Sequence, residues 1–343
     1  MMSSIKLSVL DQSAVHQNET AQEALQHTVE LAKIADEKGF HRFWVAEHHN
    51  MKERAGSSPE VLISYLLAQT NQIKIGSGGV MLQHYSPYKV AENFNVLASL
   101  APGRVDLGVG KSPGGLPVST ATLQKGVSQD DYPFTEKIKE LALWLHNQKH
   151  TDEKGDEIRA YPLPPVPADL FLLGTSKGSA ELAAKLGVSF VFAQFINSDE
   201  QALEEAIKAF QQNVDQHVQK KPAFILALPV ITAETNEEAK SLISNDEIVK
   251  VHLKSGKTFT LASEENAREF GNQSGEPYEI KKQERKVIFG TQALVREELL
   301  ALQKKLGIDE FIILTPIDDA EKRKRSLILL KDAFHHDHAE TLA

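Results

Sequence analysis

The chain has 343 residues, with 38 basic residues against 47 acidic ones and therefore a formal net charge of −9. This acidic balance argues against general binding to nucleic acid or to anionic membranes. The sequence contains no cysteine, which excludes disulfides, thiolate nucleophiles and cysteine metal ligands. The apolar run near the N-terminus is too short for a signal peptide or a membrane helix, so we expect a cytoplasmic protein.

Strand-like and helix-like segments alternate along the chain. A strand at 5–10 precedes a helix that Thr20 and Glu23 open as a capping box and that Gly39 closes. The second strand ends at Ala46. Further strands are expected at 73–80, 104–110, 170–174, 188–194, 223–231 and 310–315. Further helices are expected at 59–71, 87–100, 134–147, 177–186, 199–218, 235–253, 291–306 and 318–335.

The number and order of these elements predict the fold. Eight strands with helical crossovers imply a parallel sheet, and eight strands close a TIM (β/α)8 barrel. The rival open, doubly wound sheet normally shows a glycine fingerprint after its first strand, and "LDQSAVHQ" has none. We therefore predict a single α/β barrel domain over 1–343.

Two long polar segments interrupt the alternation. One covers 111–133 after the fourth strand, and the other is an insertion at 254–290 after the seventh strand, with a hairpin expected at "LKSGKTFTLA". Loops that follow strands gather at the catalytic face of a TIM barrel. Such segments are either lids or surface decoration.

Glu47, His48 and His49 directly follow the second strand, in "FHRFWVAEHHN". Adjacent histidines on an extended chain point to opposite faces, so chelation of one metal by both is awkward. No other His/Asp/Glu cluster has metal-ligand spacing, and we predict no metal site. The alternatives are a buried, satisfied histidine or a catalytic one, and the position at a strand C-terminus favours catalysis.

Three glycines, Gly76, Gly78 and Gly79, lie inside the third strand, in "IGSGGVML". Glycine weakens a strand, so such residues usually mark a bulge or a place where a ligand lies against the backbone. Of these two readings we favour ligand approach.

A phosphate site is predicted across two neighbouring strands. "LGVGKSPGG" lacks the spacing of a P-loop, but it leaves Lys111 just past the fourth strand. Gly174, Thr175 and Ser176 open the helix after the fifth strand, and Ser179 lies one turn further on. The free N–H groups of a helix N-terminus attract anions. Successive strands are neighbours in a barrel, which brings Lys111 and this turn together.

Five segments together resemble one family. They are "GFHRFWVAEHHN", "IGSGGVMLQHYSPYKVAENF", "PGRVDLGVGKSPGG", "LLGTSKGSAELAAKLG" and "DEFIILTPIDDAEKRKRSL". The sequence resembles the bacterial luciferase-like flavin monooxygenases, and among them the alkanal monooxygenase-like members of unassigned substrate. The resemblance is collinear over nearly the whole chain and is weakest at 111–165 and 254–290.

The resemblance implies a two-component enzyme, an oxidoreductase acting on paired donors with O2. Reduced FMN, supplied by a separate flavin reductase, reacts with O2 to a C4a-peroxyflavin that oxygenates a small organic substrate. The family is usually dimeric through the helices after strands two and three, here 59–71 and 87–100. Their apolar residues include Val61, Leu62, Leu66, Leu67, Phe94 and Leu97.

The resemblance also assigns site residues. His48 matches the catalytic histidine beside the flavin, and Glu47 is expected to orient the site. The non-proline cis peptide under the flavin ring falls on Gly78–Gly79. The flavin phosphate falls on the group of Lys111, Gly174, Thr175, Ser176 and Ser179. Lysine replaces the family's usual arginine here, which keeps the charge but loses the bidentate fork.

Other functions on the same barrel are a deazaflavin-dependent oxidoreductase and a flavin-binding storage protein. Retention of His48 favours catalysis over storage, and the "SGGVML" and "GKSPG" variants look more like the FMN branch. Gln194 and Phe195 occupy a region that is tryptophan-rich in luciferase, so the resemblance does not extend to light emission or to a long-chain aldehyde substrate. The insertion at 254–290 corresponds to luciferase's mobile lid and is expected to exclude water.

Overall fold

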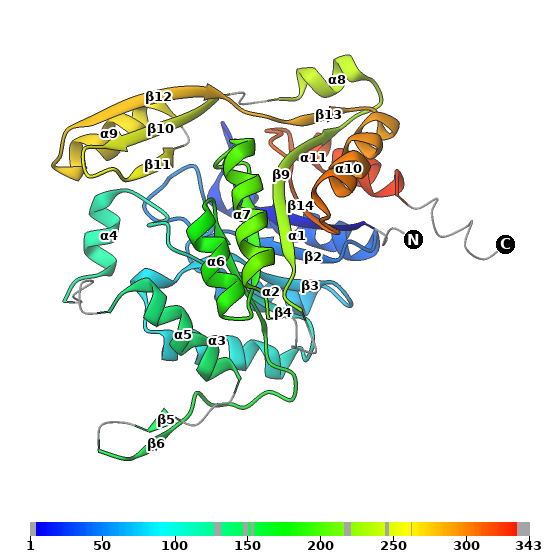
Figure 1. The fold of residues 1–343 in the computed structure, drawn as a ribbon. Helices are drawn as coiled ribbons and strands as arrows, with labels where there is room; N and C mark the ends of the chain where they lie inside the picture. Colours follow the sequence, from blue (N-terminus) through cyan, green and yellow to red (C-terminus); the bar gives the residue numbers. More distant parts are fainter. Residues whose placement is uncertain are drawn as a thin grey trace.

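The structure is a computed structural model that describes residues 5–126, 132–146, 150–151, 154–215, 221–243, 247–261 and 263–334. At its centre, parallel strands form a closed barrel (Figure 1). In barrel order the strands are β1 (Lys6–Asp11), β2 (Arg42–Val45), β3 (Lys74–Met81), β4 (Val105–Gly110), β7 (Asp169–Gly174), β8 (Ser189–Ala193), β9 (Phe224–Thr232) and β14 (Glu310–Leu314). Because β14 pairs with both β9 and β1, and β8 pairs with β9, the eight strands form a closed ring, which confirms the predicted TIM barrel.

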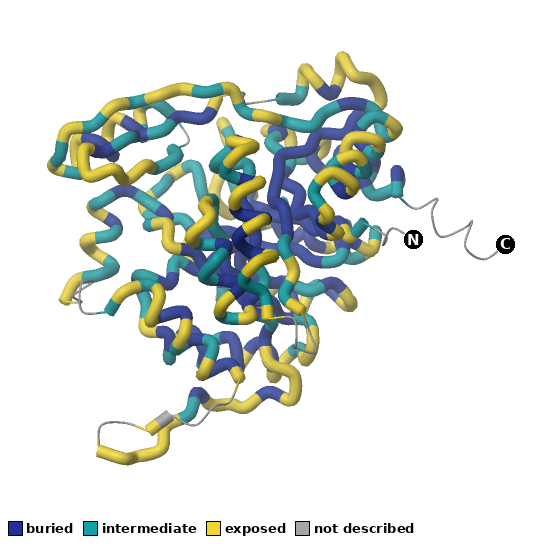
Figure 2. Tube along the Cα trace, in the orientation of Figure 1, coloured by how far each residue is buried: buried dark blue, intermediate teal, exposed yellow. Residues whose placement is uncertain are grey.

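An outer ring of helices covers the strands. It consists of α1 (Ala21–Glu37), α2 (Pro59–Gln69), α3 (Pro87–Leu100), α5 (Phe134–Leu145), α6 (Lys177–Lys185), α7 (Glu200–Asn213), α10 (Gln292–Leu306) and α11 (Ala320–Asp332). The predicted capping box is present: Thr20 Oγ1 accepts from Glu23 N at 3.2 Å, and Glu23 Oε2 accepts from Thr20 N at 2.8 Å. Buried residues concentrate in the barrel strands and on the inward faces of the helices (Figure 2).

Shorter elements decorate the loops. They are η1 (Leu82–His84), α4 (Pro117–Leu123), β5 (His150–Thr151), β6 (Glu157–Ile158) and α8 (Asn236–Ser241). The predicted loop 111–133 thus contains a helix, α4, and its residues 127–131 lie outside the described part. The C-terminal residues of the helices predicted to end at 147, 218 and 335 also lie outside it. In the described part of the chain, no helix is both long and apolar enough to cross a membrane.

The helix predicted over 235–253 is wrong in its second half. Only α8 is helical there, and β10 (Glu247–Leu253) is a strand in which buried and less buried residues largely alternate. This alternation in "EIVKVHL" is the two-residue period of a half-buried strand. The predicted hairpin at 253–262 is confirmed by the antiparallel pairing of β10 with β11 (Thr258–Leu261).

The insertion after β9 is a small sheet backed by a helix. β12 (Tyr278–Glu284) completes a three-stranded antiparallel sheet with β10 and β11, and α9 (Glu264–Ser274) packs against it. α9 contacts α4 in the loop after β4 (Figure 1), and Gln283 Nε2 donates to Ser198 Oγ in the loop after β8 at 3.0 Å. β13 (Ile288–Gly290) then pairs with the end of β9. The insertion therefore lies beside the carboxyl ends of the strands.

The apolar residues of α2 and α3 do not all face outward. Leu66, Leu67, Phe94 and Leu97, expected at a dimer surface, are buried in the chain's own core, because they lie on the helix faces that pack against the barrel. Leu62 is partly buried against the same core. The exposed apolar residues of these two helices are Val61, Tyr65, Val96 and Leu100.

Charged residues fill the part of the barrel interior that lies near the amino ends of the strands. Arg42 Nη1 donates to Asp106 Oδ2 and Arg42 Nε to Glu310 Oε1, each at 2.6 Å. Trp44 Nε1 also donates to Asp106 Oδ2, at 3.0 Å. Burial lowers the pKa of Arg42, but the charges of Asp106 and Glu310 outweigh this effect and raise it. The guanidinium is therefore a permanent cation that neutralises two buried carboxylates.

An apolar layer lies above these charges, towards the carboxyl ends of the strands. It consists of Leu10, Trp44, Ala46, Phe171, Val191, Ile225, Ala227, Ile312 and Leu314. Gly76 makes room for this arrangement, because a Cβ there would lie 2.6 Å from Asp106 Cβ and 2.9 Å from Trp44 Nε1. Internal packing is therefore a sufficient reason for glycine at position 76.

Removing the Arg42 charge should strongly destabilise the protein. In Arg42→Met, Asp106 and Glu310 keep their burial but lose their main counter-charge, so we expect the free energy of unfolding in urea to fall by about 3–5 kcal/mol. Arg268→Met is the matched control, since Arg268 pairs with Glu264 on the exposed face of α9; it should cost less than about 1 kcal/mol. Equal losses in the two variants would contradict this account.

Candidate functional site

The Glu47–His49 segment lies at the carboxyl end of the barrel, directly after β2. Its backbone is fixed on both sides: His48 N donates to Gly56 O and His49 N to Gly114 O, each at 2.8 Å. Gly115 is required beside it, because a Cβ there would lie 2.3 Å from His49 O. The three side chains are thus held where the loops after β2, β3 and β4 meet.

Glu47 is a buried acceptor with all of its partners inside the protein. Its side chain is 1% exposed and accepts from His49 Nε2 at 2.6 Å, Tyr85 Oη at 2.8 Å and Met81 N at 3.1 Å. Burial, together with the charge of Glu47, raises the pKa of Tyr85, which therefore remains a donor. These bonds tie the end of β2 to the end of β3 and to η1. Glu47 is therefore placed to position the segment.

His48 forms none of the hydrogen bonds of this network. Its Nδ1 is buried, and no described residue hydrogen-bonds to it. Burial lowers the pKa of His48 to about 3, with further contributions from the positive charges of Arg54 and His49. The imidazole is therefore neutral at physiological pH, with one nitrogen able to donate a proton and the other able to accept one.

A non-proline cis peptide joins Gly78 to Gly79, as the family resemblance implies. The register of β3 against β4 shifts between Gly78 and Val80, so the alternative of a bulge also applies. A Cβ at Gly78 would lie 2.7 Å from Leu10 Cδ1, and one at Gly79 would lie 2.7 Å from Gly108 O. Glycine is thus required for close packing here, and this part of the barrel wall carries no side chains.

The residues predicted to hold a phosphate lie at the ends of β4 and β7, which pair in parallel. Lys111 is exposed. Ser176 caps α6, and its Oγ accepts from Ser179 N at 3.3 Å and lies 3.1 Å from Ser179 Oγ. A Cβ at Gly174 would lie 2.7 Å from Ser179 Cβ, so glycine is needed for this turn.

Thr175 and Gly110 complete the surroundings of this turn. Asn197 Nδ2 donates to Thr175 O at 3.2 Å, which links the turn to the loop after β8. A Cβ at Gly110 would meet no atom within 4 Å. Open space therefore lies beside the end of β4, next to Lys111.

Three residues near this site escaped the sequence analysis: Tyr85, Arg54 and Arg285. Arg54 lies between β2 and α2, and Arg285 lies between β12 and β13. Burial lowers the pKa of both arginines, and the charge of Arg54 lowers that of Arg285 further. Their positions in loops after β2 and β9 were the available signal, since such loops gather at the catalytic face.

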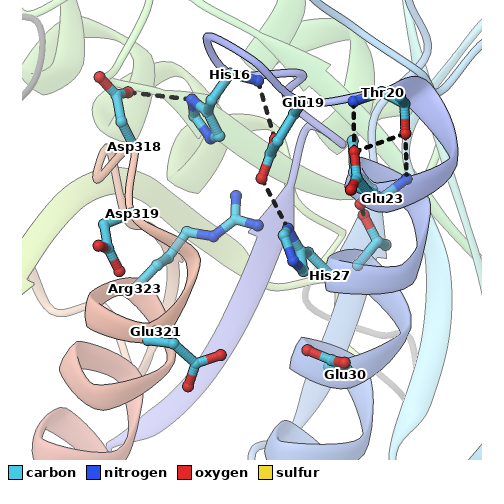
Figure 3. A network of polar contacts seen from close by, with 12 residues as sticks. His16, Glu19, Thr20, Glu23, His27, Glu30, Asp318, Asp319, Glu321 and Arg323 are labelled. Atoms are coloured by element: carbon cyan, nitrogen blue, oxygen red, sulfur yellow. Dashed lines mark hydrogen bonds and ion pairs between the residues drawn. The ribbon is translucent and has the colours of Figure 1, made fainter.

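A second polar cluster lies in an open surface hollow of about 490 Å³ between α1 and α11 (Figure 3). His16 Nδ1 lies 3.2 Å from Asp318 Oδ1, and His27 Nδ1 lies 3.0 Å from Glu19 Oε1. Asp319 caps α11. Across the described residues, no group of three or more His, Asp or Glu side chains could hold a metal ion. These contacts are those of helix caps and loop packing.

Glu47→Gln should lower the stability of the fold. An amide cannot accept from all three donors that surround this carboxylate, and charge-assisted hydrogen bonds are worth more than neutral ones. We expect the free energy of unfolding to fall by about 2 kcal/mol. Glu204→Gln, on the exposed face of α7, is the control and should be neutral. An unchanged stability of Glu47→Gln would show that the network does not hold the segment.

The burial of neutral His48 predicts a pH dependence of stability. Its folded-state pKa of about 3 lies below the ordinary value of 6.5, so the unfolded chain takes up the proton first as the pH falls. Stability is then lost from about pH 6.5 downward. Between pH 7 and 5 the wild type should lose about 1–2 kcal/mol more than His48→Gln. His146→Gln changes an exposed histidine and should follow the wild type; identical curves for all three proteins would refute the assignment.

Comparisons of the sequence and of the structure with known proteins point to the same family. The family model described as luciferase-like monooxygenase matches residues 5–310. An N-acetyl-S-alkylcysteine monooxygenase of Bacillus subtilis (strain 168) is 47% identical over 329 residues, which cover 96% of this chain and 98% of that protein. A luciferase-like monooxygenase of Escherichia coli (strain K12) is 33% identical, with 96% of each chain covered. The crystal structure of apo-MsnO8 matches with a TM-score of 0.77 and 33% identity, over 96% of this chain and 98% of that one.

Proposed function

Because this chain belongs to the luciferase-like monooxygenase family, we propose that it is a two-component monooxygenase that uses reduced FMN and O2 to oxygenate a small organic substrate. The observation that carries this proposal is the neutral His48, whose buried Nδ1 has no partner among the described residues, at the same end of the barrel as the side-chain-free wall at Gly78–Gly79. A flat redox cofactor needs a surface free of side chains to lie on, and its reaction needs a proton-transfer group close by.

The residues present fit FMN. The peptide at Gly78–Gly79 offers no Cβ to obstruct an isoalloxazine ring. Lys111 and the N-terminus of α6, with Gly174, Thr175, Ser176 and Ser179, offer a cation, hydroxyls and free N–H groups to the phosphate. The open space beside Gly110 lies next to Lys111. When bound, the reduced ring supplies the electrons that activate O2.

The protein's own residues then have separate tasks. His48 moves a proton at Nδ1 to or from the reacting groups, as a neutral imidazole can at physiological pH. Glu47, through Tyr85 and His49, holds the His48 segment in place. The insertion, which contacts the loops after β4 and β8, excludes water from the barrel mouth as a lid.

Two partners belong to this proposal. The sequence carries no recognisable nicotinamide site, so a separate reductase, in the cytoplasm, supplies the reduced flavin. A homodimer forms through α2 and α3, where Val61, Tyr65, Val96 and Leu100 expose apolar surface that a second copy would cover. Leu66, Leu67, Phe94 and Leu97 contribute indirectly, since they fix both helices to the barrel.

Two alternatives use the same barrel. A storage protein would bind oxidised FMN tightly and retain it through purification, and a neutral, unpartnered His48 would have no task in it. A deazaflavin-dependent oxidoreductase would transfer hydride without consuming O2. The name of the Bacillus subtilis relative makes N-acetyl-S-alkylcysteines the first substrates to test here.

The test is the coupling of oxygen consumption to product. The protein is loaded anaerobically with reduced FMN and mixed with O2 and N-acetyl-S-alkylcysteines, and the oxygenated product and hydrogen peroxide are quantified. We expect less peroxide than from free reduced FMN, and a product yield that His48→Ala lowers at least about 100-fold with flavin binding retained. Peroxide equal to the O2 consumed, across a wider substrate panel, would contradict the proposal.

Lys111→Met separates flavin binding from chemistry in the same assay. It should weaken binding of reduced FMN and leave reduced riboflavin, which has no phosphate, unaffected. Lys125→Met, outside the proposed site, is the control. Equal effects of Lys111→Met on both flavins would remove Lys111 from the phosphate site.

A further inference from the structure

We propose that Arg54 and Arg285 form an anion site beside His48 that binds a carboxylate group of the organic substrate. This inference deepens the function proposed above and rests on it for the reaction, while the anion site itself rests on the contacts of the two arginines.

Arg54 is held near His48 by its backbone. Ala55 N donates to Ser13 O at 2.9 Å, Ala14 and Arg54 form an isolated antiparallel bridge, and His48 N donates to Gly56 O. The Arg54 side chain donates only to neutral oxygens, Glu53 O at 2.9 Å and Gln12 Oε1 at 3.4 Å. No carboxylate of the described residues forms an ion pair with it. Its guanidinium is therefore a partly buried cation that forms no ion pair with the described residues.

Asp11 is the carboxylate whose charge acts most strongly on Arg54, but its oxygens already accept hydrogen bonds from other residues. Asp11 Oδ1 accepts from Arg323 Nη1 at 3.2 Å, and Asp11 Oδ2 accepts from Thr28 Oγ1 at 2.5 Å and from Ser13 N at 3.2 Å. The charge of Asp11 is thus matched by Arg323. The charges of Asp11, Glu53 and Asp318 also act on Arg54, but no described carboxylate forms an ion pair with it, and burial still lowers its pKa.

Arg285 adds a second cation with an unused donor. Its Nε is buried, and no described residue accepts a hydrogen bond from it. The charge of Arg54 lowers the pKa of His48 and, separately, that of Arg285. The chain on either side of Arg285 fixes it at the same end of the barrel, since Gln283 Nε2 donates to Ser198 Oγ in the loop after β8 and Ile288 pairs with Val230 at the end of β9. The two arginines that are buried in the described part of the chain are paired, Arg42 with Asp106 and Glu310, and Arg323 with Asp11. Two neighbouring arginines without such partners are poised for an anion that is not part of the chain.

The chemistry of the site favours a carboxylate. Guanidinium groups present planar pairs of N–H donors that match the two oxygens of a carboxylate. The phosphate of FMN is assigned to Lys111 and α6, at the ends of β4 and β7, whereas Arg54 follows β2 and Arg285 adjoins the end of β9. A substrate carboxylate on the arginines would fix one end of the molecule and leave its oxidisable part beside His48.

Binding measurements test the site without turnover. N-acetyl-S-methylcysteine and a panel of small aliphatic and aromatic carboxylates, each with its primary amide, are titrated calorimetrically into the full-length protein with oxidised FMN present. We expect at least one acid to bind 10-fold or more tightly than its amide. Arg54→Met and Arg285→Met should abolish this preference, Arg→Lys variants should restore part of it, and Arg268→Met should leave it intact.

Thermal stability without ligand provides an independent readout. Relief of the repulsion between two partly buried cations should raise the midpoint of Arg54→Met or Arg285→Met by at least about 1 °C, the opposite of Arg42→Met. A purely structural role for these arginines would lower the midpoint instead and would count against the site.

The remaining outcomes separate this inference from the proposed function. If no acid binds better than its amide, or if the arginine variants weaken FMN instead of the acid, the substrate site is refuted while oxygenation of a neutral substrate can still be measured. If an acid binds through the arginines but no product forms with reduced FMN and O2, the anion site stands and the monooxygenase assignment fails.

Discussion

The buried guanidinium of Arg42 determines how the barrel is filled. Its ion pairs with Asp106 and Glu310 place charge in the interior near the amino ends of the strands, and the same Asp106 orients the Trp44 indole above it. Trp44 and its apolar neighbours then close the barrel below the functional end. Charged and apolar layers thus fill the interior of the barrel, so that the chemistry we propose is left to the carboxyl ends of the strands, where His48 and its neighbours lie.

The same kind of side chain serves opposite purposes at the two ends of the barrel. At the amino ends of the strands, the charge of Arg42 is balanced by Asp106 and Glu310, and these ion pairs stabilise the fold. At the mouth, Arg54 and Arg285 have no carboxylate partner among the described residues, and Arg285 Nε has no acceptor there. Uncompensated buried charge costs stability. Proteins keep destabilising charges of this kind where binding requires them, which is the usual trade-off between stability and activity.

Local patterns in the sequence predicted what depends on local physics. Strand alternation, the Thr20–Glu23 cap and barrel order placed the eight strands and brought the ends of β4 and β7 together. The Gly78–Gly79 cis peptide came from the family resemblance. Sequence did not reveal which faces of α2 and α3 are exposed, nor the contacts of Gly76, since both depend on packing between distant elements. Arg54 and Arg285 are more than two hundred positions apart, and no local pattern connects them.

The position of Arg285 between β12 and β13 has a mechanical consequence. The insertion rejoins the barrel there, since β12 belongs to the three-stranded sheet and β13 to the wall of the barrel. A displacement of the insertion would therefore displace this guanidinium relative to Arg54, whose backbone is held by the loops after β1 and β2. An anion that contacts both arginines would stabilise one position of the insertion. By thermodynamic linkage, that position of the insertion then strengthens anion binding by the same free energy. If the two arginines bind the substrate as we propose, substrate binding and closure of the insertion are one equilibrium.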